Sequence, residues 1–572
     1  MQCAVSGRKC AVRSMPLSVF LLTMFLFSVH DLFGQQVALP DEGQSLLVQK
    51  YLNDSVAGYW NGKSIPWTNR PHTAVQPYVN FDLTAQMRKL PEDPAFSQKN
   101  GANALPTVLC QLGTRFTWHT IYDQPDFSDW NDDRKFAFGI KPIYDLQAGY
   151  DLKASRPLIV TTGGVRIGGD YKRKIGFDLR LAAGIVTLPN YQDSIASTFG
   201  IVPGWGDRAY FLDSAKYGFQ HFSGNIIWRP SPVFNLQVGR DKHFWGEGHR
   251  SLFLSDLGPA MPYIKAQTTI WKLQYTSLFT WLQDWTNSTG SNKDFRSKFA
   301  SFHYLSVNFT KWLNIGVFES VVWQGTDNNR ARWFDANYLN PLVFFRPVEY
   351  SIGSSDNAML GIAGKIRFNR NNVLYGQIVL DEFYLTEIKK WKEGWWGNKQ
   401  GMQVGYKCYN FGLVENMLMQ MEVNIVRPYT YSHGSPQQSY SHGGMPLAHP
   451  MGANFAEFFG MLSYHIQGFT VSGKLVGIRY GADVNDTMNY GQNIFQSYIT
   501  REKERGNELF QGYATNIFLA EFHASYVFNT KFPLRLEFTA GARSEKNAVK
   551  NLKSSYIVGG LCLPLWRANR DY

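Results

Sequence analysis

The chain has 572 residues, of which 15% are aromatic and only 18% are charged, whereas soluble domains typically carry about 25% charged residues. Its 57 basic and 45 acidic side chains give a formal charge of +12, and the basic residues are dispersed along the chain, so nucleic acid is not an expected partner. After the first 34 residues no apolar run approaches the roughly 20 residues of a membrane helix. Any structure that spans a membrane must therefore be built of strands.

Residues 1–34 have the features of an export signal peptide. Three basic residues precede an apolar core at 15–29, and Gly34 offers a small residue for cleavage. A retained membrane anchor is the alternative, but this core is shorter than a span. Removal of the signal leaves 54 basic and 44 acidic side chains, a formal charge of +10. Such an excess suits a pore lining, lipopolysaccharide phosphates or an acidic polysaccharide.

Residues 35–138 differ from the remainder and are expected to form a small periplasmic segment. Within them, residues 42–53 place apolar side chains at helical spacing, which predicts a short amphipathic helix. Trp60, Trp67 and Trp118 indicate that this segment packs against another surface, for which the mouth of a barrel is the natural candidate.

Apolar and polar residues alternate strictly in several stretches of the remaining chain. Leu534, Leu536 and Phe538 alternate with Arg535 and Glu537. The same period of two recurs at 419–425 and 177–184. This pattern is typical of barrel strands with one face toward lipid and the other toward the lumen. A soluble β-sandwich would show similar strands, so the lengths of the connections must distinguish it from a membrane barrel.

Short turns and long polar loops alternate from about residue 219 onward. The short turns are expected at 229–233, 310–312, 369–372, 467–468 and 529–533. The long loops are expected at 284–300, 324–358, 385–401, 428–456, 481–513 and 544–553. Membrane barrels have short turns at the periplasmic rim and long loops outside. We therefore predict an all-β fold, a transmembrane antiparallel β-barrel over residues 139–572.

The strand count reaches about eighteen. Fifteen strands follow Phe219, the last of them near 555–564, and three earlier strands are centred near Ile143, Ile159 and Ile175. An even number is usual for such barrels. Polar residues then separate the last strand from the terminal Tyr572, so we expect Trp566 to be the aromatic residue that the barrel insertion machinery, an expected partner, recognises.

Two groups of residues resemble a known family. Residues 238–248, read as VGRDKHFWGEG, and 251–255 resemble the Wzi-type family of outer-membrane proteins for capsule assembly. A second group of blocks looks like the Bacteroidetes branch of that family, which includes RemB-type gliding motility proteins. Its members are 338–341, 346–349, 446–450 and 452–455. The resemblance implies an eighteen-stranded barrel with an N-terminal periplasmic part, and our strand count draws on it. It also implies a place in the cell outer membrane and a role in surface polysaccharide attachment or motility.

The block after residue 239 begins a loop that is rich in charge. Charged side chains there could not face lipid without a large cost in free energy. We therefore expect the loop to fold into the lumen and to pair with wall charges such as Arg180 or Glu319. The expected plug network is Arg240, Asp241, Lys242, Trp245, Glu247 and Arg250. A direct contact with a ligand is the alternative role.

A cluster of aromatic residues in a long loop carries the main binding hypothesis. Sugar rings stack on flat side chains, and nearby lysines such as Lys399 attract acidic groups. The candidate polysaccharide-binding residues are Trp391, Trp395, Trp396 and Lys392. Their alternative role is in the aromatic girdle at the edge of the lipid, where lipid and lipopolysaccharide are the partners.

Motifs for catalysis and for cofactor or metal binding are weak. His433, His442 and His449 lie nine and seven residues apart in a Gly/Pro-rich loop and match no usual metal-ligand spacing. The cysteines that remain after cleavage, Cys110 and two distant ones, form no disulfide framework. We expect no enzyme, cofactor or metal. The expected function is capsule or exopolysaccharide assembly or surface attachment, with a porin-like channel and then an outer-membrane hydrolase as alternatives.

Overall fold

The computed structural model describes residues 136–571 and three short strands before them, with several gaps. The gaps are residues 172–173, 232, 286–294, 311, 328–329, 332–337, 339–355, 370, 382–390, 415, 467–468, 486–487, 529–533 and 563–570. The expected signal peptide, the helix at 42–53 and Trp566 lie outside the described residues.

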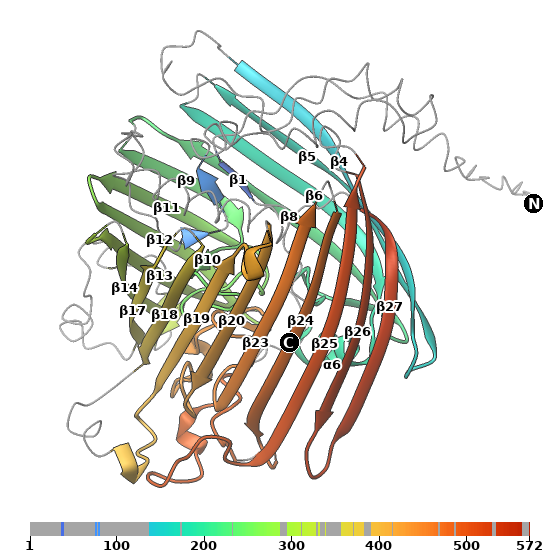
Figure 1. Ribbon diagram of the computed structural model, residues 1–572. Helices are drawn as coiled ribbons and strands as arrows, with labels where there is room; N and C mark the ends of the chain where they lie inside the picture. The colour runs from blue at the N-terminus through green and yellow to red at the C-terminus, as the bar shows by residue number, and fades with distance from the viewer. Residues whose placement is uncertain are drawn as a thin grey trace, which may run out of the picture.

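A closed antiparallel barrel of eighteen strands forms the described part of the chain, which confirms the predicted fold (Figure 1). The barrel strands are β4 (Phe136–Asp151), β5 (Arg156–Tyr171), β6 (Ile175–Thr187), β8 (Lys216–Trp228), β9 (Phe234–Asp241), β11 (Met261–Ile270), β12 (Leu273–Asp284), β13 (Arg296–Asn308), β14 (Leu313–Gln324), β17 (Asn357–Arg367), β18 (Asn372–Asp381), β19 (Gln400–Tyr409), β20 (Met417–Val426), β23 (Phe455–Ile466), β24 (Phe469–Ala482), β25 (Tyr513–Val527), β26 (Arg535–Lys546) and β27 (Asn551–Cys562). The last strand, β27, pairs with the first, β4, through residues 556–562 and 145–151. This pairing leaves the sheet without a free edge.

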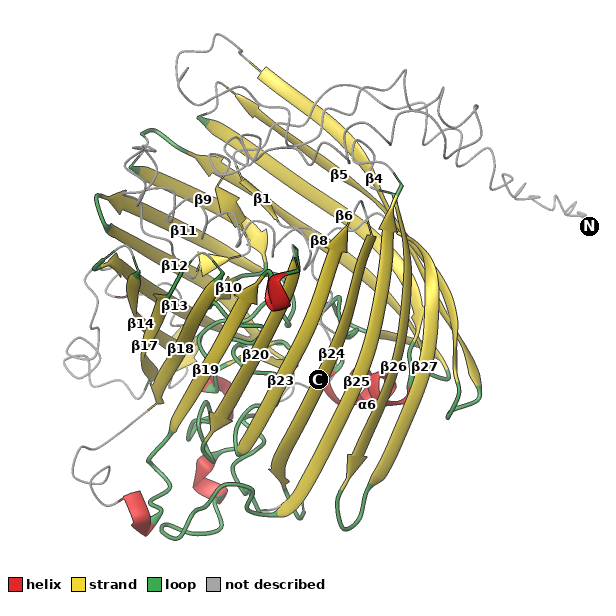
Figure 2. Cartoon of the chain, viewed as in Figure 1, coloured by secondary structure: helices red, strands yellow, loops and turns green. Residues whose placement is uncertain are grey.

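The smaller elements lie in connections or beside the barrel strands. They are β1 (Gln36–Ala38), β2 (Val75–Gln76), β3 (Tyr78–Asn80), α6 (Asn190–Phe199), β7 (Tyr210–Asp213), β10 (Phe244–Trp245), β15 (Thr326–Asp327), β16 (Arg330–Ala331), η3 (Trp391–Glu393), η4 (Phe411–Leu413), η5 (Pro436–Gln438), β21 (Ser441–His442), β22 (Met445–Pro446) and η6 (Tyr498–Thr500). Helical turns of the described residues occur only in connections between strands (Figure 2). None of the described helices is long and apolar enough to cross a membrane.

The connections differ in length between the two rims. At the short-turn rim, where β4 begins and β27 ends, the connections have at most seven residues. At the opposite rim, which we call the long-loop rim, seven connections are long. They span residues 188–215, 242–260, 285–295, 325–356, 382–399, 427–454 and 483–512. This contrast matches the predicted one.

One expected loop was wrong. Residues 544–553 mostly extend β26 and β27, which are joined by only four residues, 547–550. The polar side chains at these positions resemble a loop, but strand pairing continues through Lys546 and Asn551. Polar residues are tolerated there because the strands end at the rim of the barrel, where polar side chains can meet solvent.

Alternation along the strands separates two faces. Outward positions carry exposed apolar side chains such as Val423, Leu475 and Phe518. Inward positions carry buried polar side chains such as Gln403 and Glu422. The stretches predicted from sequence follow this division, since 419–425 and 177–184 alternate between exposed and buried in the same phase. Polar groups on the inward face need partners inside the lumen, and this requirement leads to the candidate site.

Candidate functional site

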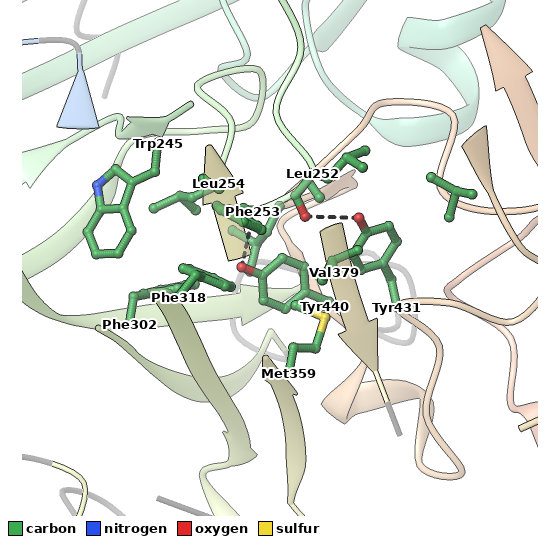
Figure 3. Close-up of a cluster of buried hydrophobic side chains, with 14 of the residues drawn as sticks. Trp245, Leu252, Phe253, Leu254, Phe302, Phe318, Met359, Val379, Tyr431 and Tyr440 are labelled. Carbon is green, nitrogen blue, oxygen red and sulfur yellow. Dashed lines mark hydrogen bonds between the residues drawn. The ribbon is translucent and has the colours of Figure 1, made fainter. Parts of the chain in front are cut away.

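The connection between β9 and β11, residues 242–260, lies inside the barrel and is called here the lumen segment. Its Trp245, Leu252, Phe253 and Leu254 have 0% exposed surface. Trp245 packs 6.0 Å from the ring of Phe302 on β13 (Figure 3). The segment is therefore a packed plug and not a surface loop.

Aromatic rings and hydroxyl groups fix the apolar part of the lumen segment. Phe253 stacks on Phe318 of β14 with ring centroids 4.4 Å apart and planes 5° from parallel. Tyr431 and Tyr440, from the connection 427–454, donate hydrogen bonds to the carbonyl oxygens of Leu252 (2.9 Å) and Phe253 (2.6 Å) (Figure 3). A long-loop connection thus covers the plug, and its tyrosines satisfy the plug's buried backbone.

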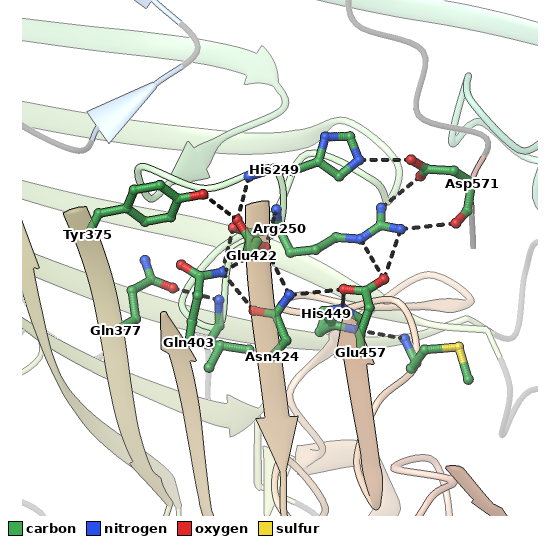
Figure 4. A network of polar contacts seen from close by, with 12 residues as sticks. His249, Arg250, Tyr375, Gln377, Gln403, Glu422, Asn424, His449, Glu457 and Asp571 are labelled. Atoms are coloured by element: carbon green, nitrogen blue, oxygen red, sulfur yellow. Dashed lines mark hydrogen bonds and ion pairs between the residues drawn. The ribbon is translucent and has the colours of Figure 1, made fainter. Parts of the chain in front are cut away.

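Carboxylates of the wall bind the polar part of the lumen segment. Glu422 on β20 accepts hydrogen bonds from the backbone N–H groups of His249 (2.8 Å) and Arg250 (3.1 Å) (Figure 4). The Arg250 guanidinium lies 3.3 Å from Glu457 on β23 and 2.8 Å from Asp571. Both partners are fully buried. Hydrogen bonds between charged groups offset the free energy of desolvating each charge, because every charge has a partner.

The predicted plug residues divide into those inside the lumen and one outside. Glu247 pairs with Lys365 at 2.9 Å, and Asp241 lies 3.9 Å from Arg180. The ammonium group of Lys242 donates to the carbonyl oxygen of Trp205. These residues, with Trp245 and Arg250, lie in the interior of the barrel.

Arg240 does not join this network. It continues the outward phase of Leu236 and Val238 on β9, and its guanidinium lies over Phe222, an exposed side chain of β8. Arg240 also donates a hydrogen bond to the carbonyl oxygen of Phe222. The expected inward placement was wrong because β9 continues to Asp241, so the two-residue period still holds at position 240.

Aromatic and cationic side chains gather at the long-loop rim in what we call the rim cluster. It comprises Trp395, Trp396, Lys399, Tyr429, Tyr498 and Arg501. Trp396 lies 4.6 Å from the ring of Tyr498 and 5.9 Å from that of Trp395. Arg501 lies 4.5 Å above Trp396. Both tryptophans and Tyr498 are half-buried, so each keeps part of its ring open to a ligand.

Three connections build the rim cluster and hold it in place. Trp396 donates its backbone N–H to the carbonyl oxygen of Glu504 at 3.1 Å, and Gly506 donates to Glu393 at 2.8 Å. Buried Tyr429, from the connection 427–454, lies 6.4 Å from Trp396. Cross-links between the connections orient these rings before any ligand arrives, which lowers the entropy cost of binding.

The predicted polysaccharide-binding residues fall only partly in the rim cluster. Trp395 and Trp396 belong to it, and Lys392 is an exposed residue of η3. Trp391 begins the same helical turn, and its side chain lies outside the described part. Lys399 was expected to attract acidic groups from solvent, but it is fully buried and lies 3.5 Å from Asp381.

Tyr498 and Arg501 were missed by the sequence analysis. They follow the tryptophans by about a hundred residues, and no spacing rule links them to residues 395–396. A helical turn, η6, and the cross-links between connections bring them together.

The loop histidines make separate structural contacts. His449 pairs with Glu457 at 2.7 Å, and His442 accepts the backbone N–H of Gln283 at 3.1 Å. Burial, with the nearby Lys298 charge, lowers the pKa of His442 to about 3, so this imidazole is neutral at physiological pH. Within the described residues, no group of three or more His, Cys, Asp or Glu side chains is arranged to hold a metal ion.

No protein-family model matches the chain, and no curated protein matches its sequence. Among solved structures, Wzi of Escherichia coli superposes with a TM-score of 0.52 at 11% identity, covering 93% of this chain and 99% of Wzi. The chain has a Wzi-like fold. Wzi is described as an outer-membrane protein involved in group 1 capsule assembly and as a carbohydrate-binding β-barrel.

Two further solved structures are less similar to this chain than Wzi is. OprD of Pseudomonas aeruginosa gives a TM-score of 0.41 at 9% identity, covering 76% of this chain and 98% of OprD. OccAB2 of Acinetobacter baumannii gives 0.39 at 10% identity, covering 74% and 96%.

Proposed function

We propose that this protein resides in the cell outer membrane and binds a surface polysaccharide at the rim cluster, in the assembly or surface attachment of capsule or exopolysaccharide. The observation that carries the proposal is the pairing of half-exposed Trp395, Trp396 and Tyr498 with the cation of Arg501 at the rim where loops are long. The proposed role is binding and not catalysis.

Polysaccharide chemistry fits this arrangement in two ways. The C–H faces of sugar rings are apolar and pack against indole and phenol rings, which lose little conformational entropy on binding. A guanidinium beside the rings attracts uronate, phosphate or sulfate groups and can donate two hydrogen bonds to a pair of their oxygens. The Arg501 guanidinium pairs with the exposed carboxylate of Glu504, and its side chain keeps 20% of its surface exposed, so an acidic group of a ligand would compete with Glu504 for it.

A filled lumen argues for binding over transport. A barrel of this size leaves room for a channel unless something fills it. Here the lumen segment places Trp245 and three further apolar side chains at 0% exposure in the interior. A porin-like channel needs a water-filled path, and a packed apolar plug opposes one. The likeness to Wzi supports the proposal only as an analogy of fold.

The test replaces the open aromatic faces and measures polysaccharide binding. The triple variant Trp395→Ala, Trp396→Ala, Tyr498→Ala should bind isolated cell-surface polysaccharide at least about tenfold more weakly, equal to about 1.4 kcal/mol. The matched control replaces Trp271 and Trp312, which are exposed at the short-turn rim. Equal binding by the triple variant and the wild type would contradict the proposal.

A deletion strain tests the biological role. We expect polysaccharide to move from the cell surface into the medium, with restoration by the wild-type gene but not by the triple variant. A strain that keeps its surface polysaccharide and loses movement over surfaces would replace this role with the motility role suggested by the RemB-type resemblance.

A further inference from the structure

A groove crosses the outward face of the barrel over six adjacent strands, from β20 to β27. Five of them, β23 to β27, run side by side in the orange to red part of Figure 1. The groove has a volume of about 820 Å³, and most of its lining residues are apolar and point outward. Strand pairing sets one residue from each strand in a single row, which is Met419, Leu462, Gly473, Phe522, Ala540 and Ile557. The groove therefore runs across the strands and not along one of them.

Small and large side chains together give the groove its depth. On the outward face of β24, Gly473 is next to exposed Leu475. On β25, Ala520 is next to exposed Phe522. A Cβ atom on Gly473 would meet nothing within 4 Å, so the space above it is open. An extended hydrocarbon chain can lie in such a groove, because it gains van der Waals contacts with both walls that a flat surface does not offer.

Basic side chains lie where the groove meets the long-loop rim, and we call them the basic band. Its members are Lys153, Arg479, Lys546 and Lys553, all exposed. The last three lie at even intervals from groove residues of their own strands, so the pleat turns them outward as well. Lys153 follows Leu152, whose backbone N–H donates to the carbonyl oxygen of Ser555 at 2.7 Å. Leu152 and Ser555 both line the groove, so the basic band is continuous with it.

Strand register spaces the cations of the basic band. Lys553 is opposite Ser544, two residues from Lys546, so these two lysines are diagonal neighbours with Cβ atoms roughly 7–8 Å apart. Arg479 and Lys546 lie on either side of Asn516, two strand spacings or roughly 10 Å apart. Within the described part of the chain, none of the four cations is paired with a carboxylate. The band can therefore accept phosphate groups from outside the protein.

We propose that this face binds the lipid A part of lipopolysaccharide, with acyl chains in the groove and phosphates on the basic band. The inference rests on the proposed residence in the outer membrane, where the long-loop rim faces the cell exterior. Apolar contact alone does not select one lipid there, because the chains of every lipid are apolar. The basic band supplies the selection, through its attraction for phosphate. A second copy docked through the same face would bring two basic bands together, which disfavours a dimer at this surface.

The test measures lipid binding to the purified protein by native mass spectrometry, with diphosphorylated lipid A and with phosphatidylcholine. The wild type should bind lipid A at least about tenfold more tightly than phosphatidylcholine. Lys153→Gln combined with Lys553→Gln should weaken lipid A binding about tenfold or more, because each lysine at a membrane surface contributes about fivefold. The matched control combines Lys216→Gln with Arg296→Gln, two exposed cations at the same rim on β8 and β13, and should bind like the wild type.

A second variant tests the groove separately from the charges. Gly473→Leu fills the groove without a clash and should weaken lipid A binding several-fold. It should not change binding of the deacylated, phosphorylated glucosamine disaccharide, which the lysine variant should weaken. Gly364→Leu on β17 is the matched control, because Gly364 also faces outward into open space but does not line the groove. Heat-modifiable mobility on gels checks the folding of each variant.

The outcomes separate this inference from the proposed function, because polysaccharide binding is measured on the same preparations and no groove or band variant should change it. Equal binding of lipid A and phosphatidylcholine, unchanged lipid A binding in the lysine variant, or full displacement of lipid A by inorganic phosphate would each overturn the lipid site. A protein that binds polysaccharide but not lipid A overturns this inference alone. One that binds lipid A but not polysaccharide overturns only the role of the rim cluster.

Discussion

The lumen segment and the rim cluster are built in opposite ways. The lumen segment is one continuous stretch, residues 242–260, that meets partners on many wall strands. The rim cluster is assembled from three connections, and its side chains come from positions as far apart as Trp395 and Arg501. The lumen segment is almost wholly buried, whereas the rim cluster keeps half-open rings. Substitutions in the lumen segment should therefore lower the stability of the barrel, and substitutions in the rim cluster should weaken ligand binding.

The largest expected effect breaks the charge network of the lumen. Arg250→Leu removes the guanidinium that faces buried Glu457 and Asp571. An unpaired buried charge costs about 3–5 kcal/mol, so the denaturant midpoint of the barrel should fall strongly. Arg240→Leu is the control, because Arg240 points outward from the same block. It should change stability by less than about 1 kcal/mol. Similar losses of stability in both variants would show that the effect does not depend on whether the arginine side chain points into the lumen or outward.

A smaller effect should follow from crowding the apolar part of the lumen segment. A Cβ atom on Gly361 of β17 would lie 2.4 Å from the ring of Phe253. That ring is already stacked on Phe318, so it has little room to move. Gly361→Ala should cost about 1–3 kcal/mol. Gly364→Ala is the matched control on the same strand, because a Cβ atom there meets nothing within 4 Å.

The denaturant midpoints of the two glycine variants give the measurement. Gly364→Ala should be neutral or slightly stabilising, since glycine weakens strands. A loss at position 364 equal to that at 361 would mean that strand propensity, and not contact with the lumen segment, dominates.

Acidification should loosen the connection 427–454 that covers the lumen segment. The folded pKa of His442 is about 3, lowered by burial and by Lys298, whereas an unfolded histidine titrates near 6.5. Its contribution to stability is therefore complete above about pH 6.5 and declines as the pH falls toward 3, by at most about 1.4 kcal/mol per pH unit. Acid-active protease digestion between pH 7 and 4 should show increasing cleavage in this connection. His442→Phe should reduce that pH dependence.

Much of the fold could be predicted because a barrel wall repeats every two residues. The same alternation predicts that the Arg240 side chain points outward, because it follows Phe234, Leu236 and Val238 at intervals of two residues. Strand β9 continues through position 240 to Asp241, so the period of two holds there. The rim cluster was only half predictable, because no local signal connects Trp396 with Tyr498. The location of Asp571 depends on a tertiary ion network, which no local pattern near the chain end encodes.

The smallest expected effect separates the cation of the rim cluster from its rings. Arg501→Gln removes a guanidinium that lies 4.5 Å above Trp396 but leaves the aromatic faces in place. A single cation near an exposed site contributes about 0.5–1 kcal/mol, so affinity for an acidic polysaccharide should fall by about two- to fivefold. Affinity for a neutral one should not change. Arg505→Gln is the control, because Arg505 pairs with Glu393 at the surface, where both side chains are about half exposed. Binding titrations with acidic and neutral polysaccharides give the measurement, and an equal loss for both would show that Arg501 orients the rings without attracting charge.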